Sequence, residues 1–231
     1  MFSFRLRKCA AMAVGFCIAL VSLAPGVVHA QETVLGRFSA GDLTGWEPKS
    51  FEGETSYRLI KEEGGETVLE AVSEAAASGL VLKRKIDLTK TPILIWRWRI
   101  ERPVNPPDEL SKEGDDFAAR VYFLAPGAGW LSFPDSVVYV WASGQPVGSA
   151  WPNPYTKKAH MVAVDSGAGH AGQWRTHRRN MRADFKRYFG RDITGITHIA
   201  IMTDTDNSKL SARGWYGDIR VAPAGPEDKT R

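Results

Sequence analysis

Short apolar runs separated by turn-forming clusters recur along the chain after residue 30, and this pattern restricts the fold more than any other feature. Runs of this length, bounded by Gly, Pro, Asn, Asp and Ser, are typical of β-strands. With few helical candidates between them, they predict an all-β protein in which two antiparallel sheets stack as a sandwich. The ten predicted strands are 34–38, 56–60, 67–71, 79–86, 93–100, 117–124, 137–142, 160–165, 196–203 and 215–221.

The segment 93–100 shows the clearest strand alternation. Because successive side chains of a strand point to opposite faces, its arginines Arg97 and Arg99 lie on one face and its tryptophans on the other, core face. In the segment 117–124, the same rule sends Arg120 and Tyr122 away from the core. The predicted core row of that second segment is Phe117, Ala119, Val121 and Phe123.

The first 30 residues have the layout of a secretory signal peptide. Basic residues precede an apolar stretch over 10–24, and the segment ends with the small residue Ala30. We predict cleavage after Ala30, which makes the mature chain a periplasmic or secreted protein. A retained membrane anchor is the alternative, but the apolar run is shorter than the roughly 20 residues that span a bilayer.

Cleavage at this position changes the composition of the chain. It removes both cysteines, Cys9 and Cys17, so the mature protein has no disulfide and no thiolate chemistry. It also removes three basic residues and no acidic one, leaving 27 basic against 26 acidic residues, a formal net charge of +1. This balance gives no argument for a nucleic-acid partner. All eight tryptophans remain, which is more than a core of this size needs, so we expect some of them at a surface site.

We find no internal repeat and no long linker, and predict a single domain over 31–222 with a flexible tail over 223–231. One helix is expected between His177 and Phe189, where apolar residues recur at helical spacing and Gly190 follows as a C-cap. Its other face is basic. We read that face as solvated, on a helix that covers an open end of the sandwich, with an anion-binding surface as the alternative.

A polar sheet face is the first candidate site. If the strands 93–100, 117–124 and 137–142 are neighbours, six side chains could share one surface for a carbohydrate or an anionic ligand. Guanidinium groups donate to carboxylates and hydroxyls, and aromatic rings stack on sugar rings. The alternative is an arginine ladder that is neutralised by acids and stacked on aromatic rings, with Asp115, Asp116 and Glu101 as the expected partners. The six candidates are Arg97, Arg99, Arg120, Tyr122, Tyr139 and Trp141.

The segment 145–155 contains three prolines and is not expected to form a regular strand. A rigid loop would display Trp151 and Tyr155 at the rim of the sandwich, where they could grip a glycan or a peptide. Plugging one end of the core is an equally open reading of the same two side chains.

The sequence Asp204-Thr205-Asp206-Asn207 follows an apolar strand and offers hard oxygen ligands of the kind calcium prefers. Asp204, Asp206 and Asn207 are the candidate ligands, and Asp218 could join them in three dimensions. No EF-hand pattern is present, and an Asx-turn network is the alternative reading. A structural calcium is thus the only cofactor that the sequence suggests.

Catalytic patterns are weak. The histidines show no paired ligand spacing for a transition metal, and Asp165-Ser166-Gly167 lacks the nucleophile elbow. A glycosidase needs two carboxylates about 5 to 10 Å apart. Neighbouring acids in the segments 115–116 and 204–206 could supply such a pair, but acids that close together are common in loops.

Five motifs in this order resemble a family of secreted bacterial proteins known as domain of unknown function 3047. They are GDDFAARVYF over 114–123, YVWASGQPVGSAWPNPY over 139–155, RRNMRADFKRYFG over 178–190, IAIMTDTDN over 199–207 and WYGDI over 215–219. The resemblance covers roughly 35–221 and implies a galactose-binding-type jelly roll, the sandwich of many carbohydrate-binding modules. A fold of this kind does not determine a function.

Together these features predict an exported, non-catalytic binding protein for a carbohydrate or another polyhydroxylated or anionic ligand. A hydrolase or lyase acting on envelope or extracellular polysaccharide is the first alternative. A protein-interaction module of the cell envelope, with Trp151 and Tyr155 as anchors, is the second.

Overall fold

The computed structural model describes residues 32–106, 108–127 and 134–228. The predicted signal peptide and its cleavage site lie outside these residues. The described strands are β1 (Thr33–Gly36), β2 (Trp46–Glu52), β3 (Ser56–Lys61), β4 (Thr67–Glu74), β5 (Ala77–Asp87), β6 (Ile93–Ile100), β7 (Arg120–Leu124), β8 (Ser136–Ala142), β9 (Ala150–Asn153), β10 (Thr156–Ser166), β11 (Arg175–Asn180), β12 (Gly195–Asp204), β13 (Ser211–Tyr216) and β14 (Ile219–Ala222). The helices are α1 (Met181–Phe189) and the 3₁₀ turns η1 (Phe38–Ala40) and η2 (Pro226–Asp228).

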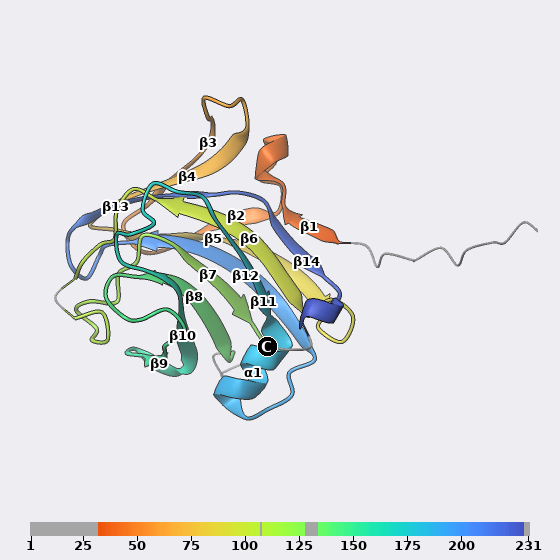
Figure 1. Cartoon of the computed structure of the whole chain (residues 1–231). Helices are drawn as coiled ribbons and strands as arrows, with labels where there is room; N and C mark the ends of the chain where they lie inside the picture. Colours follow the sequence, from red (N-terminus) through yellow and green to blue (C-terminus); the bar gives the residue numbers. More distant parts are fainter. Residues whose placement is uncertain (1–31, 107, 128–133, 229–231) are drawn as a thin grey trace, which may run out of the picture.

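These strands form two seven-stranded sheets that stack as a jelly-roll sandwich (Figure 1). Sheet A has the order β1-β14-β6-β13-β4-β3, and β11 pairs with β6. Sheet C has the order β2-β5-β12-β7-β8-β10-β9. All pairs are antiparallel except β8 with β10, which run parallel. The predicted all-β sandwich is therefore confirmed.

A cluster of large aromatic side chains fills the space between the sheets. Trp96 and Trp98 of β6 meet edge to face at 5.4 Å between ring centroids. Trp96 also stacks on Tyr139 of β8 at 5.0 Å. This confirms the predicted alternation of β6, since both tryptophans are buried while Arg97 and Arg99 lie on the outer face of sheet A.

A second, smaller apolar cluster lies on the outer face of sheet C. Phe117 belongs to it and packs on Trp151 at 6.4 Å, so its predicted place in the central core row is wrong. The physical reason is that β7 begins only at Arg120, and strand alternation does not extend back to residue 117. Val121 and Phe123 do lie in the central core, as predicted.

The helix is shorter than predicted. Residues 175–180 form β11 instead, paired along the edge of β6, and α1 starts at Met181 with the Asn180 side chain accepting the Ala183 amide at 3.0 Å. Gly190 ends it in the left-handed conformation, at φ 67°, as predicted. Phe185 packs edge to face on Phe123 at 5.7 Å, and the helix lies across one end of the sandwich (Figure 1).

The described end of the chain folds back on β11. Arg178 donates to both carboxylate oxygens of Asp228, at 2.9 and 2.7 Å, and this contact holds η2 in place. Residues 229–231, the last part of the predicted tail, lie outside the described residues. Within the described part of the chain, no helix has the length and apolar character needed to cross a membrane.

Candidate functional site

The expected common surface of six arginine and aromatic side chains does not form. β6 belongs to sheet A, whereas β7 and β8 belong to sheet C. Arg97 and Arg120 both point away from the core, but the two outer faces of a sandwich look in opposite directions. The connection from β6 to β7 crosses between the sheets, so β6 is not a neighbour of β7, whereas β7 and β8 pair as predicted.

Tyr139 and Trp141 point into the central core instead, and this corrects their predicted surface position. Both are at most 1% exposed. The Tyr139 hydroxyl donates to Asp184 of α1 at 2.5 Å, and the Trp141 indole donates to the Gly167 carbonyl at 3.0 Å. Burial, and then the Asp184 carboxylate, raise the pKa of Tyr139 well above its usual value. These two side chains hold the fold together and are not accessible to a ligand.

Arg120 lies on the outer face of sheet C but is only 2% exposed. Its Nε donates to Asp204 at 2.7 Å, and its Nη1 contacts the Asp115 carboxylate at 3.3 Å. Its guanidinium also lies over the Phe117 ring at 4.6 Å. Arg120 is thus a buried partner of two aspartates. Asp115 is one of the partners that the arginine-ladder alternative named, and Asp204 is a further one.

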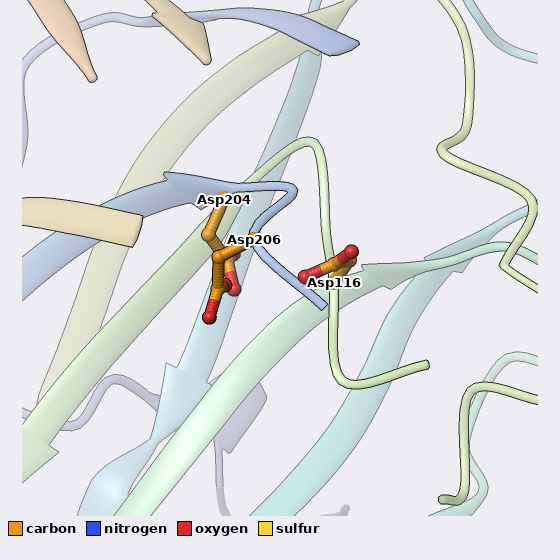
Figure 2. Close-up of side chains that lie close together, drawn as sticks. All are labelled: Asp116, Asp204 and Asp206. Atoms are coloured by element: carbon orange, nitrogen blue, oxygen red, sulfur yellow. The ribbon is translucent and has the colours of Figure 1, made fainter. Parts of the chain in front are cut away.

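Three carboxylates gather around this ion pair. Asp116, Asp204 and Asp206 each offer an oxygen atom within 4.8 Å of the others (Figure 2). Asp116 accepts the Ser208 amide at 2.6 Å and the Asn207 amide at 3.2 Å. Burial, and then the Asp116 carboxylate, raise the pKa of Asp206. We call these three residues the acidic cluster.

The acidic cluster fits a calcium ion poorly as it stands, because Arg120 binds Asp204 and amide groups bind Asp116. Asp218, predicted to join the site, lies elsewhere. It accepts the Ser39 amide at 2.8 Å and the Ser39 hydroxyl at 2.6 Å. Its predicted role as a calcium ligand beside Asp204 is therefore wrong, while calcium at Asp204, Asp206 and Asn207 stays a prediction.

The remaining aromatic candidates also lie on the sheet C side. Trp151 is 9% exposed and lies on β9, so the prediction that 145–155 forms no regular strand is wrong for residues 150–153. β9 is the edge strand of sheet C, where prolines are tolerated. Tyr155 is 55% exposed, and its hydroxyl donates to the Lys112 carbonyl at 3.3 Å. The Tyr122 hydroxyl contacts the Met202 sulfur at 3.6 Å. Of the three, only Tyr155 presents a largely exposed ring at the rim.

Arg97 and Arg99 are held on the outer face of sheet A by two glutamates from the turn between β3 and β4. Arg97 pairs with Glu66 and Arg99 pairs with Glu62. These ion pairs are partly open to solvent, since the arginine side chains are 29% and 22% exposed. The face is therefore an arginine ladder, but its carboxylates come from the hairpin and not from Asp115, Asp116 or Glu101.

Two tryptophans complete this face. The Trp174 ring lies 4.5 Å from the Arg97 guanidinium and 5.1 Å from that of Arg99, and its indole donates to Glu62 at 3.0 Å. Trp215 of β13 lies 4.2 Å below the Arg99 guanidinium. Trp174 was not predicted as a site residue. It lies directly before β11, whose polar sequence shows no alternation of apolar and polar residues that would indicate a strand. Its only signal was the surplus of tryptophans over the needs of the core.

Gly217 allows Arg97 to lie flat on the sheet. A Cβ atom at this position would meet the Arg97 side chain at 2.4 to 3.0 Å, at its Nε, Cγ and Cδ atoms. The Gly217 amide also donates to the Arg97 carbonyl at 3.0 Å. The glycine of the WYGDI motif is thus a packing requirement of the arginine ladder.

Beside Arg97, the outer face of sheet A is hollowed into a groove of about 340 Å³, which we call the outer groove. Its lining carries both charges, with Arg97 and Arg220 as cations and Glu66 and Asp218 as anions. Ser39 and Thr176 add hydroxyl groups. The outer groove is lined by Ser39, Glu66, Ile95, Trp96, Arg97, Thr176, Asp218 and Arg220.

The sequence matches the model of the family described as "Protein of unknown function (DUF3047)" over residues 44–220. The chain belongs to this family. No curated protein matches it. The description of this family names no activity, so membership in DUF3047 does not say what the outer groove binds.

Several solved structures share the sandwich fold with this DUF3047 chain. The family 30 carbohydrate-binding module of a cellulosomal cellulase of Clostridium thermocellum is 11% identical, with a TM-score of 0.47, and the match covers 84% of this chain and 98% of that one. The K1 cleaved adhesin domain of Lys-gingipain from Porphyromonas gingivalis is 10% identical, with a TM-score of 0.42, and covers 84% and 99%. Likeness at this level describes the fold and carries no functional argument.

Proposed function

We propose that this chain is an exported, non-catalytic binding protein that holds a carbohydrate or another polyhydroxylated ligand in the outer groove. The observation that carries the proposal is the groove itself. Its volume of about 340 Å³ lies at the small end of the range of known ligand sites, which run from about 300 to 1,000 Å³. It suits a small ligand, or one segment of a longer chain lying across the sheet.

The lining of the outer groove suits hydroxyl groups. A hydroxyl both donates and accepts hydrogen bonds. Arg97 and Arg220 supply donors, while Glu66 and Asp218 supply acceptors. Neighbouring sugar hydroxyls can bridge such pairs, and Trp174, stacked beside Arg97, adds an aromatic edge where a sugar ring can pack.

The carboxylates of the outer groove support binding without catalysis. A glycosidase needs one carboxyl group as acid and a second as base or nucleophile. Asp218 is bound by Ser39 through two hydrogen bonds, and Glu66 is paired with Arg97. Both carboxylates are thus engaged by protein donors in the free protein, as expected of groups that bind a ligand and do not transfer protons.

A glycan-array screen of the mature protein, with analysis of products from each hit, tests the proposal. Thr176 is exposed on β11 at the groove wall, so Thr176→Trp should fill the groove and abolish binding. Thr33→Trp is the matched control, because Thr33 is exposed on β1 of the same sheet and does not line the groove. Binding that survives Thr176→Trp would refute the groove as the site, and turnover of a hit would refute the non-catalytic reading.

Export is tested separately. Mass spectrometry of the periplasmic or secreted form should find Gln31 at the N-terminus. An intact Met1 in that pool would contradict cleavage after Ala30.

A further inference from the structure

We infer that the natural ligand of the outer groove is an acidic glycan that extends from the groove onto the adjacent Arg99, and that Glu62 and Glu66 occupy the places of its carboxylates in the free protein. The inference rests on the proposed ligand site and adds the charge of the ligand and the means by which it enters.

Glu62 and Glu66 lie at the tip of the β3–β4 hairpin, which projects from the edge of the sandwich (Figure 1). Within the tip, the Glu62 amide donates to the Glu66 carbonyl at 2.9 Å and the Gly65 amide donates to the Glu62 carbonyl at 2.8 Å. The turn is therefore closed on itself. What joins it to β6 is the pair of side-chain carboxylates on Arg97 and Arg99.

The two arginines form a site with a defined spacing. They are two residues apart on one strand and on the same face, so their Cα atoms are roughly 7 Å apart. Each guanidinium stacks on Trp174, which restricts its orientation. Two carboxylates, one for each guanidinium, match this arrangement, as Glu62 and Glu66 do from the hairpin turn.

These ion pairs can be exchanged, unlike the pair at Arg120. Glu66 is 44% and Glu62 is 19% exposed, whereas the side chains of Arg120, Asp115 and Asp204 are at most 8% exposed. Glu66 has one described charge partner, Arg97, and solvent reaches both groups, whereas Glu62 is held by Arg99 and also by the Trp174 indole. A ligand carboxylate can replace either glutamate because it makes the same kind of contact with the guanidinium.

The free protein also leaves donors without acceptors at this face. Among the described residues, the buried Nε of Arg99 and the buried indole nitrogen of Trp215 have no hydrogen-bond partner. The Arg99 guanidinium lies directly over the Trp215 ring, so both donors belong to one place. Both nitrogens are covered in the free protein, so a ligand rich in oxygen atoms can supply their acceptors only where it displaces the Glu62 side chain.

The test measures binding of trigalacturonate and of its neutral methyl ester by calorimetry. The double variant Glu62→Gln/Glu66→Gln removes both competing charges and should tighten trigalacturonate binding by roughly 2- to 30-fold. The control Glu54→Gln/Glu63→Gln makes the same charge change at exposed glutamates for which the structure describes no ion pair, and should change affinity less than twofold. Arg97→Gln/Arg99→Gln should abolish the preference for the acid over the ester.

Hydrogen exchange gives a second readout. Exchange at the tip amides 62–66 should rise when trigalacturonate binds, because the hairpin is released. Unchanged exchange together with unchanged affinity of the glutamate variant would overturn the inference.

The two proposals fail in different ways. If neutral glycans bind, are blocked by Thr176→Trp and compete equally with acidic ones, the groove is a ligand site and only the acidic-ligand inference is wrong. If no oligosaccharide binds, acidic or neutral, both are wrong.

Discussion

The indole nitrogen of Trp98 on β6 donates to the carboxylate of Asp165 on β10 at 2.7 Å, and this buried bond ties the two sheets together across the core. Asp165 also accepts from His177 Nε2 at 2.5 Å and from Arg175 Nε at 3.0 Å. The Asp165 side chain is 2% exposed, so its ionised form is stable in the core only because these three donors bind it.

Trp98→Phe should destabilise the protein by about 1 to 3 kcal/mol more than Trp96→Phe, as measured by denaturant unfolding. Both changes remove the same indole atoms from one buried strand. Only Trp98 has a hydrogen-bond partner, since the Trp96 indole has none among the described residues. Equal losses in the two variants would show that the bond to Asp165 contributes nothing measurable.

Asp165 should make the protein acid-sensitive. Burial opposes ionisation of this carboxyl, but the hydrogen bonds from His177, Trp98 and Arg175 outweigh it and lower its pKa. A lowered pKa stabilises the fold above the unfolded value of about 3.9, and that contribution is lost as the pH falls through the native pKa. The unfolding free energy should therefore fall below about pH 4 in the wild type. A flatter acid limb is expected for Asp165→Asn, and an identical pH profile would contradict the assignment.

Gly217→Ala should weaken ligand binding while leaving the protein folded. The added Cβ meets Arg97 side-chain atoms at 3.0 Å or less and displaces the guanidinium from the groove. Losing a charge-assisted hydrogen bond costs about 1.5 to 3 kcal/mol, or roughly 10- to 150-fold in affinity. Gly169→Ala is the control, because its Cβ would meet nothing within 4 Å and the residue lies outside the groove lining and the hairpin tip. Circular dichroism checks the fold, and unchanged affinity in Gly217→Ala would exclude a role for Arg97.

Arg120→Ala should cost about 3 to 5 kcal/mol of stability, because it leaves the Asp204 and Asp115 carboxylates buried without their partner. Ligand affinity per folded molecule should not change. Arg37→Ala removes a pair in which the arginine is 62% exposed, and should cost no more than about 1 kcal/mol. A lowered affinity in folded Arg120→Ala would return this residue to the ligand site.

Calcium and Asp206 can be tested in one melting experiment. If a calcium ion binds the acidic cluster, Tm must rise between chelator and millimolar calcium, and Asp206→Asn must remove that rise.

Without calcium, Asp206 has a raised pKa, so its contribution to stability is present at low pH and lost as the pH rises through the native value. Asp206→Asn should then raise Tm at pH 7 by roughly 1 to 4 °C but not at pH 3. For the calcium prediction, an equal Tm in chelator and in millimolar calcium would show that the acidic cluster binds no calcium.

The local pattern of the sequence by itself determined most of the strands and the inward faces of β6 and β7, while β2, β9 and β11 were not predicted. Trp96, Trp98, Val121 and Phe123 lie in the core as predicted, because side-chain alternation depends only on the strand backbone. The C-cap at Gly190 was equally predictable, since a left-handed residue after a helix favours glycine. The all-β sandwich follows from such local features.

Only the tertiary structure decided which strands are neighbours. Arg97 and Arg120 obey the same alternation but lie on opposite outer faces, and Asp218 lies far from its expected partners because it is bound by Ser39. β11 escaped prediction because its inner face carries polar residues, whose acceptors Asp165 and Asp184 come from other elements. Pairing between distant segments depends on the packing of the whole chain, so the outer groove exists only once sheet A is assembled.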